Sequence, residues 1–275
     1  MPAAELPNES FQLRMVSAAV LIPLAVAAAY AGGWVFVTLV GVGVVLLANE
    51  WDRLCGGDGV RAVIGFLHAG VLLATVVLAG AGLFFAAAVV VVLGTAAATL
   101  LAPQFGRRGV WPAVGIVYFA APAIAIIWLR AEPDLGRQSI LWLLALVWAT
   151  DVGAIAVGRT VKGPRLAPKI SPAKTWSGFS GGLAGAALAG AGAAVFMGLA
   201  SLAGVVAISI GLALVSQIGD LLESVVKRHF GVKDSGTLIP GHGGILDRVD
   251  GLLLVAPAAA ILALANGGSA LSWPS

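Results

Sequence analysis

The stretch GLFFAAAVVVVLGTAAATLL, residues 82–101, contains twenty residues without a single charged side chain. A helix of about 20 apolar residues is long enough to cross the ~30 Å hydrocarbon core of a bilayer. The apolar residues are continuous and do not alternate with period two, which favours a helix over a strand of a membrane barrel. This stretch therefore predicts a transmembrane helix.

Similar runs recur along the whole chain of 275 residues, of which 60% are hydrophobic. The mean hydropathy is +1.01, and soluble domains contain only about 45–50% apolar residues. We therefore predict an all-α polytopic membrane protein with about nine transmembrane helices. The expected spans are residues 14–31, 34–49, 62–79, 82–101, 112–129, 138–158, 178–199, 202–222 and 251–266.

Polar residues divide the chain into two regions. Residues 1–137 are expected to form about five spans with few polar features, and residues 138–275 a catalytic region of about four spans with loops at 158–178 and 228–245. In the first region, Glu50 and Asp52 lie beside Arg53 at a predicted helix boundary, and we interpret them as a solvated helix end. His68, alone on an apolar span, is interpreted as a packing residue.

The distribution of basic residues predicts the orientation. With the N-terminus in the cytoplasm, fourteen of the sixteen lysines and arginines lie on the cytoplasmic side, and Arg130 and Arg137 lie opposite. Cytoplasmic loops carry such an excess of Lys and Arg. The Ala/Gly/Val-rich composition and short termini fit a bacterial inner (plasma) membrane, with the active site at the cytoplasmic face.

Composition also excludes some classes of protein. The net charge of +3 is explained by topology and by attraction to anionic lipid head groups, and no nucleic-acid-binding module is present. Cys55 is the single cysteine, so neither an intrachain disulfide framework nor a thiolate zinc site is possible. The small residues of SGFSGGLAGAALAGAGAA, residues 177–194, indicate close packing of helix backbones.

Asp151, in LLALVWATDVGAIAVGR, lies eight positions inside the span end marked by Arg159. A carboxylate at such a depth costs about 2.5–3.5 kcal/mol on insertion scales. We therefore expect Asp151 to face a polar cavity or a cation.

The loop GRTVKGPRLAPKISPAKTWSG, residues 158–178, contains three prolines that forbid one continuous helix and favour extended or turn conformations. Ser171, Lys174 and Thr175 combine positive charge with hydroxyl donors, which suits phosphate oxygens. Topology and lipid attraction explain the lysines equally well but not the prolines or hydroxyls.

Acidic residues cluster in the last two spans. Asp220, Glu223, Ser224 and Lys227 share one face of a helix, because they follow one another at i, i+3, i+4 and i+7. Glu223 and Lys227 also make an ordinary i,i+4 pair. The ninth helix is expected to begin near Ile245, with Asp247 and Asp250 in its first turns.

Asp220, Asp247 and Asp250 are expected to converge where the eighth and ninth spans meet. Carboxylate oxygens are hard ligands that suit Mg²⁺ shared with substrate phosphates. We therefore predict that these three aspartates hold Mg²⁺, as one or two cations.

The segment SVVKRHFGVKDSGTLIPGHGGILDRVD, residues 224–250, resembles the signature of the phosphatidate cytidylyltransferase (CDP-diacylglycerol synthase) family. The matching pattern is Ser-x-x-Lys-Arg, then Lys-Asp-x-Gly, then Pro-x-His-Gly-Gly-x-x-Asp-Arg-x-Asp. ATDVGAIAVGR and LAPKISPAKTWSGFSGG are similar to other segments of that family. Ser177 departs from it, because the family usually has Glu or Gln there, and this puts an essential acidic group at that position in doubt.

The resemblance implies transfer of a cytidylyl group from CTP to phosphatidate, with Mg²⁺ required, by a homodimer in the membrane. Catalytic roles fall on Asp220, Asp247, Asp250, Lys227 and Arg248, and the other substrate-binding residues would be Ser171, Lys174, Thr175, Ser224, Arg228, Lys233, His242, Gly243, Gly244 and Asp151. Lys227, Arg228, Lys233 and Arg248 would bind the triphosphate, and Ser171, Lys174 and Thr175 the lipid phosphate or the nucleotide.

Two other functions share some of these sequence features. Intramembrane aspartates also occur in cation or proton transporters, but the polar groups here gather at one face and no inverted repeat is evident. A CDP-alcohol phosphotransferase would carry an Asp-Gly-x-x-Ala-Arg pattern, which is absent from the sequence.

Overall fold

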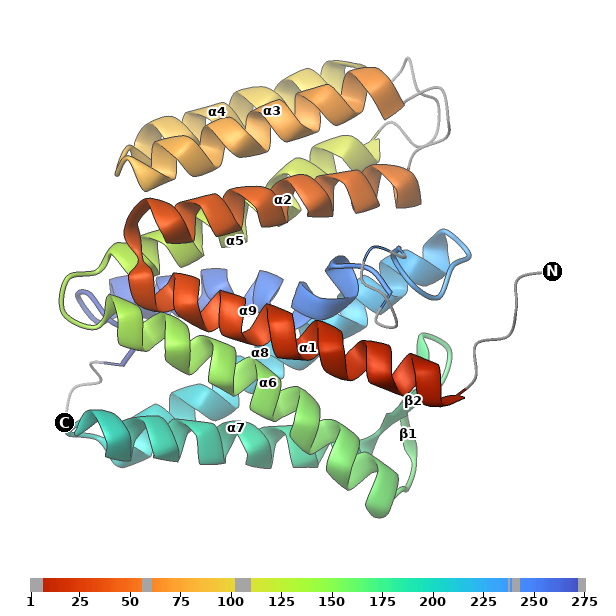
Figure 1. Ribbon diagram of the computed structural model, residues 1–275, viewed down its shortest axis with the longest axis vertical. Coiled ribbons are helices and arrows are strands. Elements are labelled where there is room, and N and C mark those ends of the chain that lie inside the picture. The colour runs from red at the N-terminus through yellow and green to blue at the C-terminus, as the bar shows by residue number, and fades with distance from the viewer. Residues whose placement is uncertain (1–6, 56–60, 102–109, 237, 239–242, 272–275) are drawn as a thin grey trace.

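A computed structural model describes residues 7–55, 61–101, 110–236, 238 and 243–271 (Figure 1). In this part of the chain nine helices and two short strands follow one another, and successive helices cross the molecule in opposite directions (Figure 1). Their bounds are α1 Pro7–Ala31, α2 Gly33–Cys55, α3 Arg61–Gly80, α4 Phe84–Leu101, α5 Val110–Ala131, α6 Gly136–Thr160, β1 Arg165–Ala167, β2 Ser171–Thr175, α7 Trp176–Met197, α8 Leu202–His229 and α9 Leu246–Ala265.

The predicted all-α membrane fold is confirmed. Among the described residues, seven helices are long and apolar enough to cross a membrane: α2 and α4 to α9. The apolar parts of α1 and α3, Val16–Ala31 and Gly65–Gly80, are shorter than the about 20 residues that a full span needs. All nine predicted spans therefore correspond to helices, of which seven meet the length of a membrane span within the described residues.

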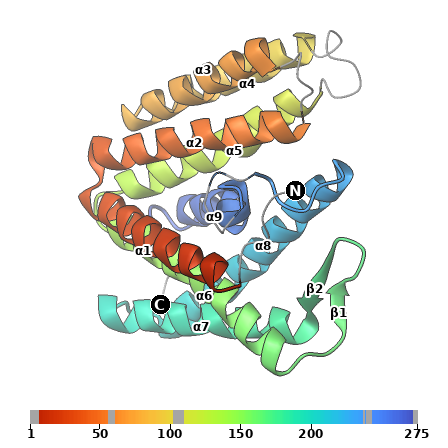
Figure 2. The same ribbon diagram turned by 45° about the vertical axis from the view of Figure 1, so that its right-hand side comes forward.

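The helices form layers. α3 and α4 lie outermost on one side, α2 and α5 lie beneath them, and α6 to α9 form the other side with α1 across them (Figure 1, Figure 2). One apolar core joins α6 to α9, and a second joins α2, α3 and α5. α9 contributes to both cores, through Val255 and Leu253 respectively. It is therefore held from both sides.

Glycines bring α6 and α7 into backbone contact. A Cβ atom added at Gly185 would lie 2.2 Å from the carbonyl oxygen of Ala149, and one at Gly153 would lie 2.4 Å from that of Gly181. No side chain fits such gaps, so the small residues of α7 serve helix packing, as the sequence indicated.

The segment between α6 and α7 forms an antiparallel hairpin. Arg165 pairs with Thr175, and Ala167 pairs with Ser171. This confirms the extended conformation predicted from the prolines. The hairpin projects from the bundle beside the C-terminal end of α8 (Figure 2).

Arg130 and Arg137 hold the C-terminal end of α1. Arg130 donates from Nε to the carbonyl oxygen of Ala29 at 2.6 Å and from Nη2 to that of Tyr30 at 3.1 Å. The guanidinium of Arg137 lies 4.7 Å from the centre of the Tyr30 ring. The last carbonyls of a helix have no partner within it, and Arg130 supplies one. Both arginines therefore have structural partners at this end of α1.

Replacing Gly185 by valine is expected to destabilise the protein by about 1–3 kcal/mol, the usual cost of overpacking. The matched control is Gly192→Val on the same helix, where an added Cβ meets no atom within 4 Å. Unfolding of the purified proteins in micelles with increasing SDS measures the difference. Equal stability of the two variants would contradict the close backbone packing at Gly185.

Candidate functional site

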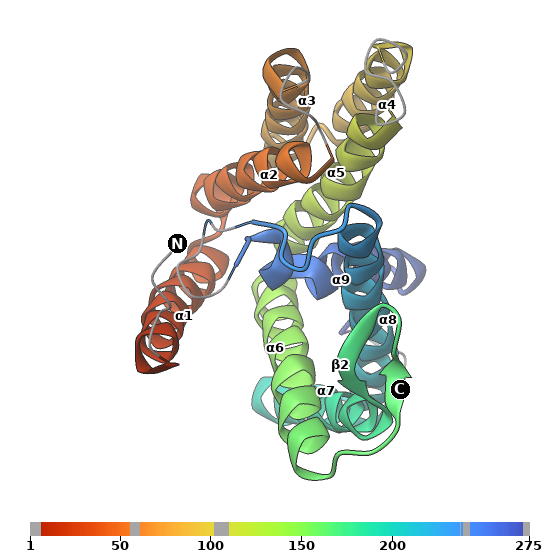
Figure 3. The ribbon, with the colours of Figure 1, turned by 90° about the vertical axis from the view of Figure 1, so that its right-hand side faces the viewer.

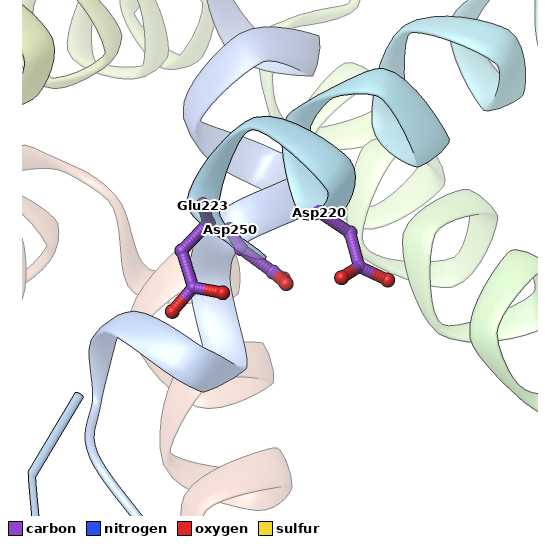
Figure 4. A group of neighbouring side chains, drawn as sticks. All are labelled: Asp220, Glu223 and Asp250. Carbon is purple, nitrogen blue, oxygen red and sulfur yellow. The ribbon is translucent and has the colours of Figure 1, made fainter. Parts of the chain in front are cut away.

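Three carboxylates meet where α8 and α9 cross. Asp220 and Glu223 come from α8 and Asp250 from α9, and each offers an oxygen within 4.8 Å of the others. The carboxylate of Asp250 lies between the other two (Figure 4). We call Asp220, Glu223 and Asp250 the acidic cluster.

Two glycines beside the acidic cluster allow this meeting. A Cβ at Gly219 would lie 2.7 Å from the carbonyl oxygen of Asp250, and one at Gly251 would lie 2.4 Å from Ser216 Oγ. Gly219 directly precedes Asp220, and Gly251 directly follows Asp250. The close approach of the two backbones therefore brings the carboxylates within reach of a shared ion.

Glu223 is the most deeply buried member, with 1% of the residue exposed. Its Oε2 pairs with Lys227 Nζ at 2.6 Å, and its Oε1 has no hydrogen-bond partner within the described residues. A buried carboxylate oxygen without a partner is costly. The sequence predicted the pair with Lys227 but assigned Glu223 no part in metal binding.

Asp247 shares Lys227 with Glu223 and lies close to that carboxylate, but most of its contacts are with the segment that precedes α9. Its Oδ1 accepts from Lys227 Nζ at 2.5 Å. Its Oδ2 accepts from the backbone amides of Ser235 and Gly244, at 3.0 and 2.9 Å, and from Ser235 Oγ at 2.9 Å. The acidic cluster contains Glu223 in the place where Asp247 was predicted. A metal-binding role for Asp247 remains a prediction.

Basic residues border the acidic cluster. Lys174, from β2, forms an ion pair with Asp220 at 2.5 Å. Arg248 is exposed on α9, two residues before Asp250 of the cluster. Asp151 is exposed on α6, and its charge interacts with those of Asp220, Lys174 and Arg248. This agrees with the expectation that Asp151 faces polar groups. The hairpin thus brings a lysine to the carboxylates of α8 (Figure 3).

Several predicted binding residues have structural contacts. Thr175 Oγ1 accepts from the amide of Gly178 at 3.1 Å and caps α7. Arg228 donates to the carbonyl oxygens of Ile170 at 3.2 Å and Val232 at 2.8 Å, which ties the hairpin to the end of α8. Ser177 Oγ donates to the carbonyl oxygen of Lys162, so the residue that departs from the family pattern holds the start of the hairpin segment.

The remaining predicted residues lie around the same end of α8 and α9. Ser171 is partly buried, Ser224 is buried and Lys233 is exposed. Gly243 has φ +84°, a conformation that glycine adopts readily. His242 lies outside the described residues. The substrate-binding roles of all these residues remain predictions.

Our interpretation of Glu50 and Asp52 as a solvated helix end is wrong. Glu50 is 4% and Asp52 9% exposed, because the segment around Ser235 covers the first and α3 covers the second. Asp52 Oδ1 lies 2.8 Å from Nδ1 of His68. His68 is fully buried with both ring nitrogens in hydrogen bonds, which confirms it as a packing residue. The one feature of the sequence that could have indicated this burial is the position of two carboxylates so close to an apolar span.

These features define a polytopic helical membrane protein with a carboxylate cluster bordered by lysines at one end of the bundle. The chain belongs to the cytidylyltransferase family, whose sequence profile matches residues 12–265.

The chain is similar to phosphatidate cytidylyltransferases from three bacteria. That of Brucella suis is 48% identical over 159 residues, which cover 58% of this chain and 59% of the relative. That of Pseudomonas aeruginosa is 33% identical over 272 residues, or 94% of this chain and 98% of the relative. That of Bacillus subtilis is 40% identical over 153 residues, which cover 52% of this chain and 56% of the relative. The chain thus spans 59% of the Brucella suis relative and nearly all of the Pseudomonas one.

Replacing Lys227 by methionine is expected to destabilise the protein by about 3–5 kcal/mol, because it leaves the buried carboxylates of Glu223 and Asp247 without their cation. Lys174→Met is the matched control. Its pair with Asp220 has side chains 25% and 35% exposed, and such pairs contribute only about 0–1 kcal/mol. SDS unfolding in the presence of EDTA compares the two, and an equal loss would contradict the proposed difference.

Proposed function

We propose that this protein is a phosphatidate cytidylyltransferase, which converts CTP and phosphatidate into CDP-diacylglycerol and pyrophosphate for phospholipid synthesis. The observation that carries this proposal is the acidic cluster at the crossing of α8 and α9, bordered by Lys174 and Lys227. Membership of the cytidylyltransferase family and the relatives' names support the choice of substrates.

In the proposed reaction, a phosphate oxygen of phosphatidate attacks the α-phosphorus of CTP. The new P–O bond forms as the bond from the α-phosphorus to the bridging oxygen of the β-phosphate breaks, and pyrophosphate leaves with that oxygen. The lipid supplies the nucleophile, so no covalent intermediate with the protein is needed. Catalysis then depends on aligning two polyanions and neutralising their charge.

The acidic cluster fits a divalent cation. Three carboxylate oxygens lie within 4.8 Å of one another, and Glu223 Oε1 is buried with no partner in the described chain. Asp220, Glu223 and Asp250 would hold Mg²⁺. As the sequence predicted, Asp247 would be a further ligand, and a second cation would bind at the same site. Bound there, Mg²⁺ would neutralise phosphate oxygens of the substrates.

The cationic residues would bind the phosphates. Lys227 is fixed between Glu223 and Asp247, so it is positioned rather than mobile. Lys233, Arg228 and Arg248 are exposed around it, which suits binding of the triphosphate. Lys174, Ser171 and Thr175 on β2 would contact the lipid phosphate or the nucleotide. Ser224, Asp151, His242 and the amides of Gly243 and Gly244 complete the proposed binding set.

We further propose that the site faces the cytoplasm of a bacterium and that the protein lies in the inner membrane as a homodimer. Lys162, Arg165 and Lys169 follow the C-terminal end of α6, whereas Arg130 and Arg137 lie at its other end, in the last turn of α5 and the first turn of α6. The positive-inside rule then favours a cytoplasmic site and N-terminus. The bacterial relatives support the choice of membrane, and the mass of the purified protein in detergent tests the dimer.

The proposed activity is tested with purified protein in vesicles that contain phosphatidate, supplied with CTP labelled on the cytidine. Label is expected to enter the lipid phase with release of pyrophosphate. Asp250→Asn is expected to lower the rate by at least a hundredfold, whereas Asp134→Asn, at an exposed position, should leave it unchanged. Absence of lipid-soluble label from the wild-type protein would refute the proposal, and ion uptake without such label would favour a transporter.

The metal ligands are tested by Mg²⁺ titration after chelation. Glu223→Gln is expected to raise the Mg²⁺ concentration for half-maximal activity about 10–100-fold, since one ligand is lost. If Asp247 acts only through its contacts with Lys227 and the 235–244 backbone, Asp247→Asn will lower kcat without this shift. Undiminished turnover of the wild-type protein without a divalent cation would rule out the metal site.

A further inference from the structure

Glu50 lies at the C-terminal end of α2, far in sequence from the acidic cluster, yet it binds the segment that leads into α9. Its Oε1 accepts from the amide of Ile245 at 2.8 Å, and its Oε2 from the amide of Leu246 at 2.9 Å. Ser235 Oγ lies 3.2 Å from the same Oε2 and shares its one hydrogen between this oxygen and Asp247 Oδ2, which lies 2.9 Å away. The carboxylate of Glu50 is therefore enclosed by two separate parts of this segment.

These contacts supply a helix cap that α9 lacks. The first amides of a helix have no partner inside it, and the N-cap residue, Ile245, makes no side-chain capping bond. Negative charge at a helix N-terminus is also favoured by the helix dipole. Glu50 provides both the acceptor oxygens and the charge from another helix.

The glycines of this segment fit against Glu50. A Cβ at Gly236 would lie 2.9 Å from Glu50 Oε1, and one at Gly244 would lie 2.6 Å from Oε2 and 1.9 Å from Ser235 Oγ. Two glycines of the motif at residues 224–250 are thus required because the backbone closes around this carboxylate.

A chain of contacts continues from Glu50 into the candidate site. Ser235 Oγ lies within hydrogen-bonding distance of both Glu50 Oε2 and Asp247 Oδ2. Asp247 binds Lys227, and Lys227 pairs with Glu223 of the acidic cluster. A shift of Glu50 would therefore reach Lys227 through two side chains.

Glu50 is itself held firmly. The next residue, Trp51, is 1% exposed and donates from Nε1 to the carbonyl oxygen of Trp111 at 2.9 Å. The end of α8 docks on the same Trp111, whose ring centre lies 4.9 Å from that of Phe230. The N-terminal helices thus fix both ends of the segment between α8 and α9.

We propose that Glu50 is a positioning residue for the reaction: it sets the start of α9, and through Ser235 and Asp247 it sets Lys227. This proposal rests on the proposed function for its kinetic part only. Through Glu50, α2 of the N-terminal region takes part in shaping a site whose charged groups lie on α8, α9 and the hairpin.

The test compares Glu50→Gln with Asp52→Asn. Glutamine has one acceptor oxygen, so its NH₂ group would face one of the two α9 amides. Asp52 is a buried carboxylate on the same helix, but it contacts α3 instead of this segment. The two variants therefore separate loss of the cap from general loosening of α2.

In Glu50→Gln, we expect hydrogen exchange, followed by mass spectrometry, to become at least tenfold faster for peptides that cover residues 243–248. We also expect kcat for cytidylyl transfer to fall about 10–100-fold, as for loss of a group that orients a ligand. Asp52→Asn should leave both unchanged in the folded fraction. Glu50→Asp, which keeps two acceptor oxygens, should recover part of kcat.

Ser235→Ala keeps the proposal testable if Glu50→Gln fails to insert, because it removes only the bridging hydroxyl. We expect it to lower kcat several-fold. Unchanged exchange in Glu50→Gln, unchanged kcat in both Glu50→Gln and Ser235→Ala, or an equal effect in Asp52→Asn would overturn the proposal. Hydrogen exchange does not depend on turnover. An inactive wild-type protein with a Glu50-dependent exchange rate would therefore count against the proposed function and in favour of the cap.

Discussion

The site depends on the close crossing of α8 and α9 at Gly219 and Gly251. At this point the two backbones touch, and the neighbouring residues, Asp220 and Asp250, are forced to share a small volume with Glu223. Like charges so close repel one another unless cations balance them. Lys174 and Lys227 supply part of that balance, and the remaining demand for positive charge is the reason that a divalent cation suits the site.

The same principle, small residues where backbones must meet, also organises the rest of the bundle. Gly153, Gly181 and Gly185 let α6 and α7 touch, and these two helices flank the hairpin that carries Lys174. In a bilayer, apolar surface gives little drive for helix association, so close packing and polar contacts decide the arrangement. The positions of the hairpin and of Lys174 thus depend on the packing of α6 against α7.

The segment between α8 and α9 shows why the N-terminal helices matter to the site. Its motif contains the charged groups, but its conformation is set from outside by Glu50, which replaces the missing cap of α9. Asp247 then has its oxygens saturated by Ser235, Gly244 and Lys227. A carboxylate with so many donors is well suited to orient a lysine, whereas Glu223, with a buried oxygen lacking a partner in the described residues, is better suited to a cation.

The sequence by itself determined the membrane fold, because long apolar runs have few alternatives in lipid. It also determined that charged groups gather at the last two spans, since Asp220, Asp247 and Asp250 stand out against an apolar background. Its prolines indicated extended or turn conformations between α6 and α7, but the pairing of β1 with β2 was known only from the structure. It did not reveal Glu223 as a member of the acidic cluster, because an i,i+4 pair with Lys227 explained that residue fully. It misjudged Glu50 for a related reason: a carboxylate at a helix end is usually solvated, and only the packing of α2 against a segment 185 residues away buries it. Local pattern fixes which side chains are present and on which face, but which oxygens meet depends on how closely distant helices approach, and only the tertiary structure decides that.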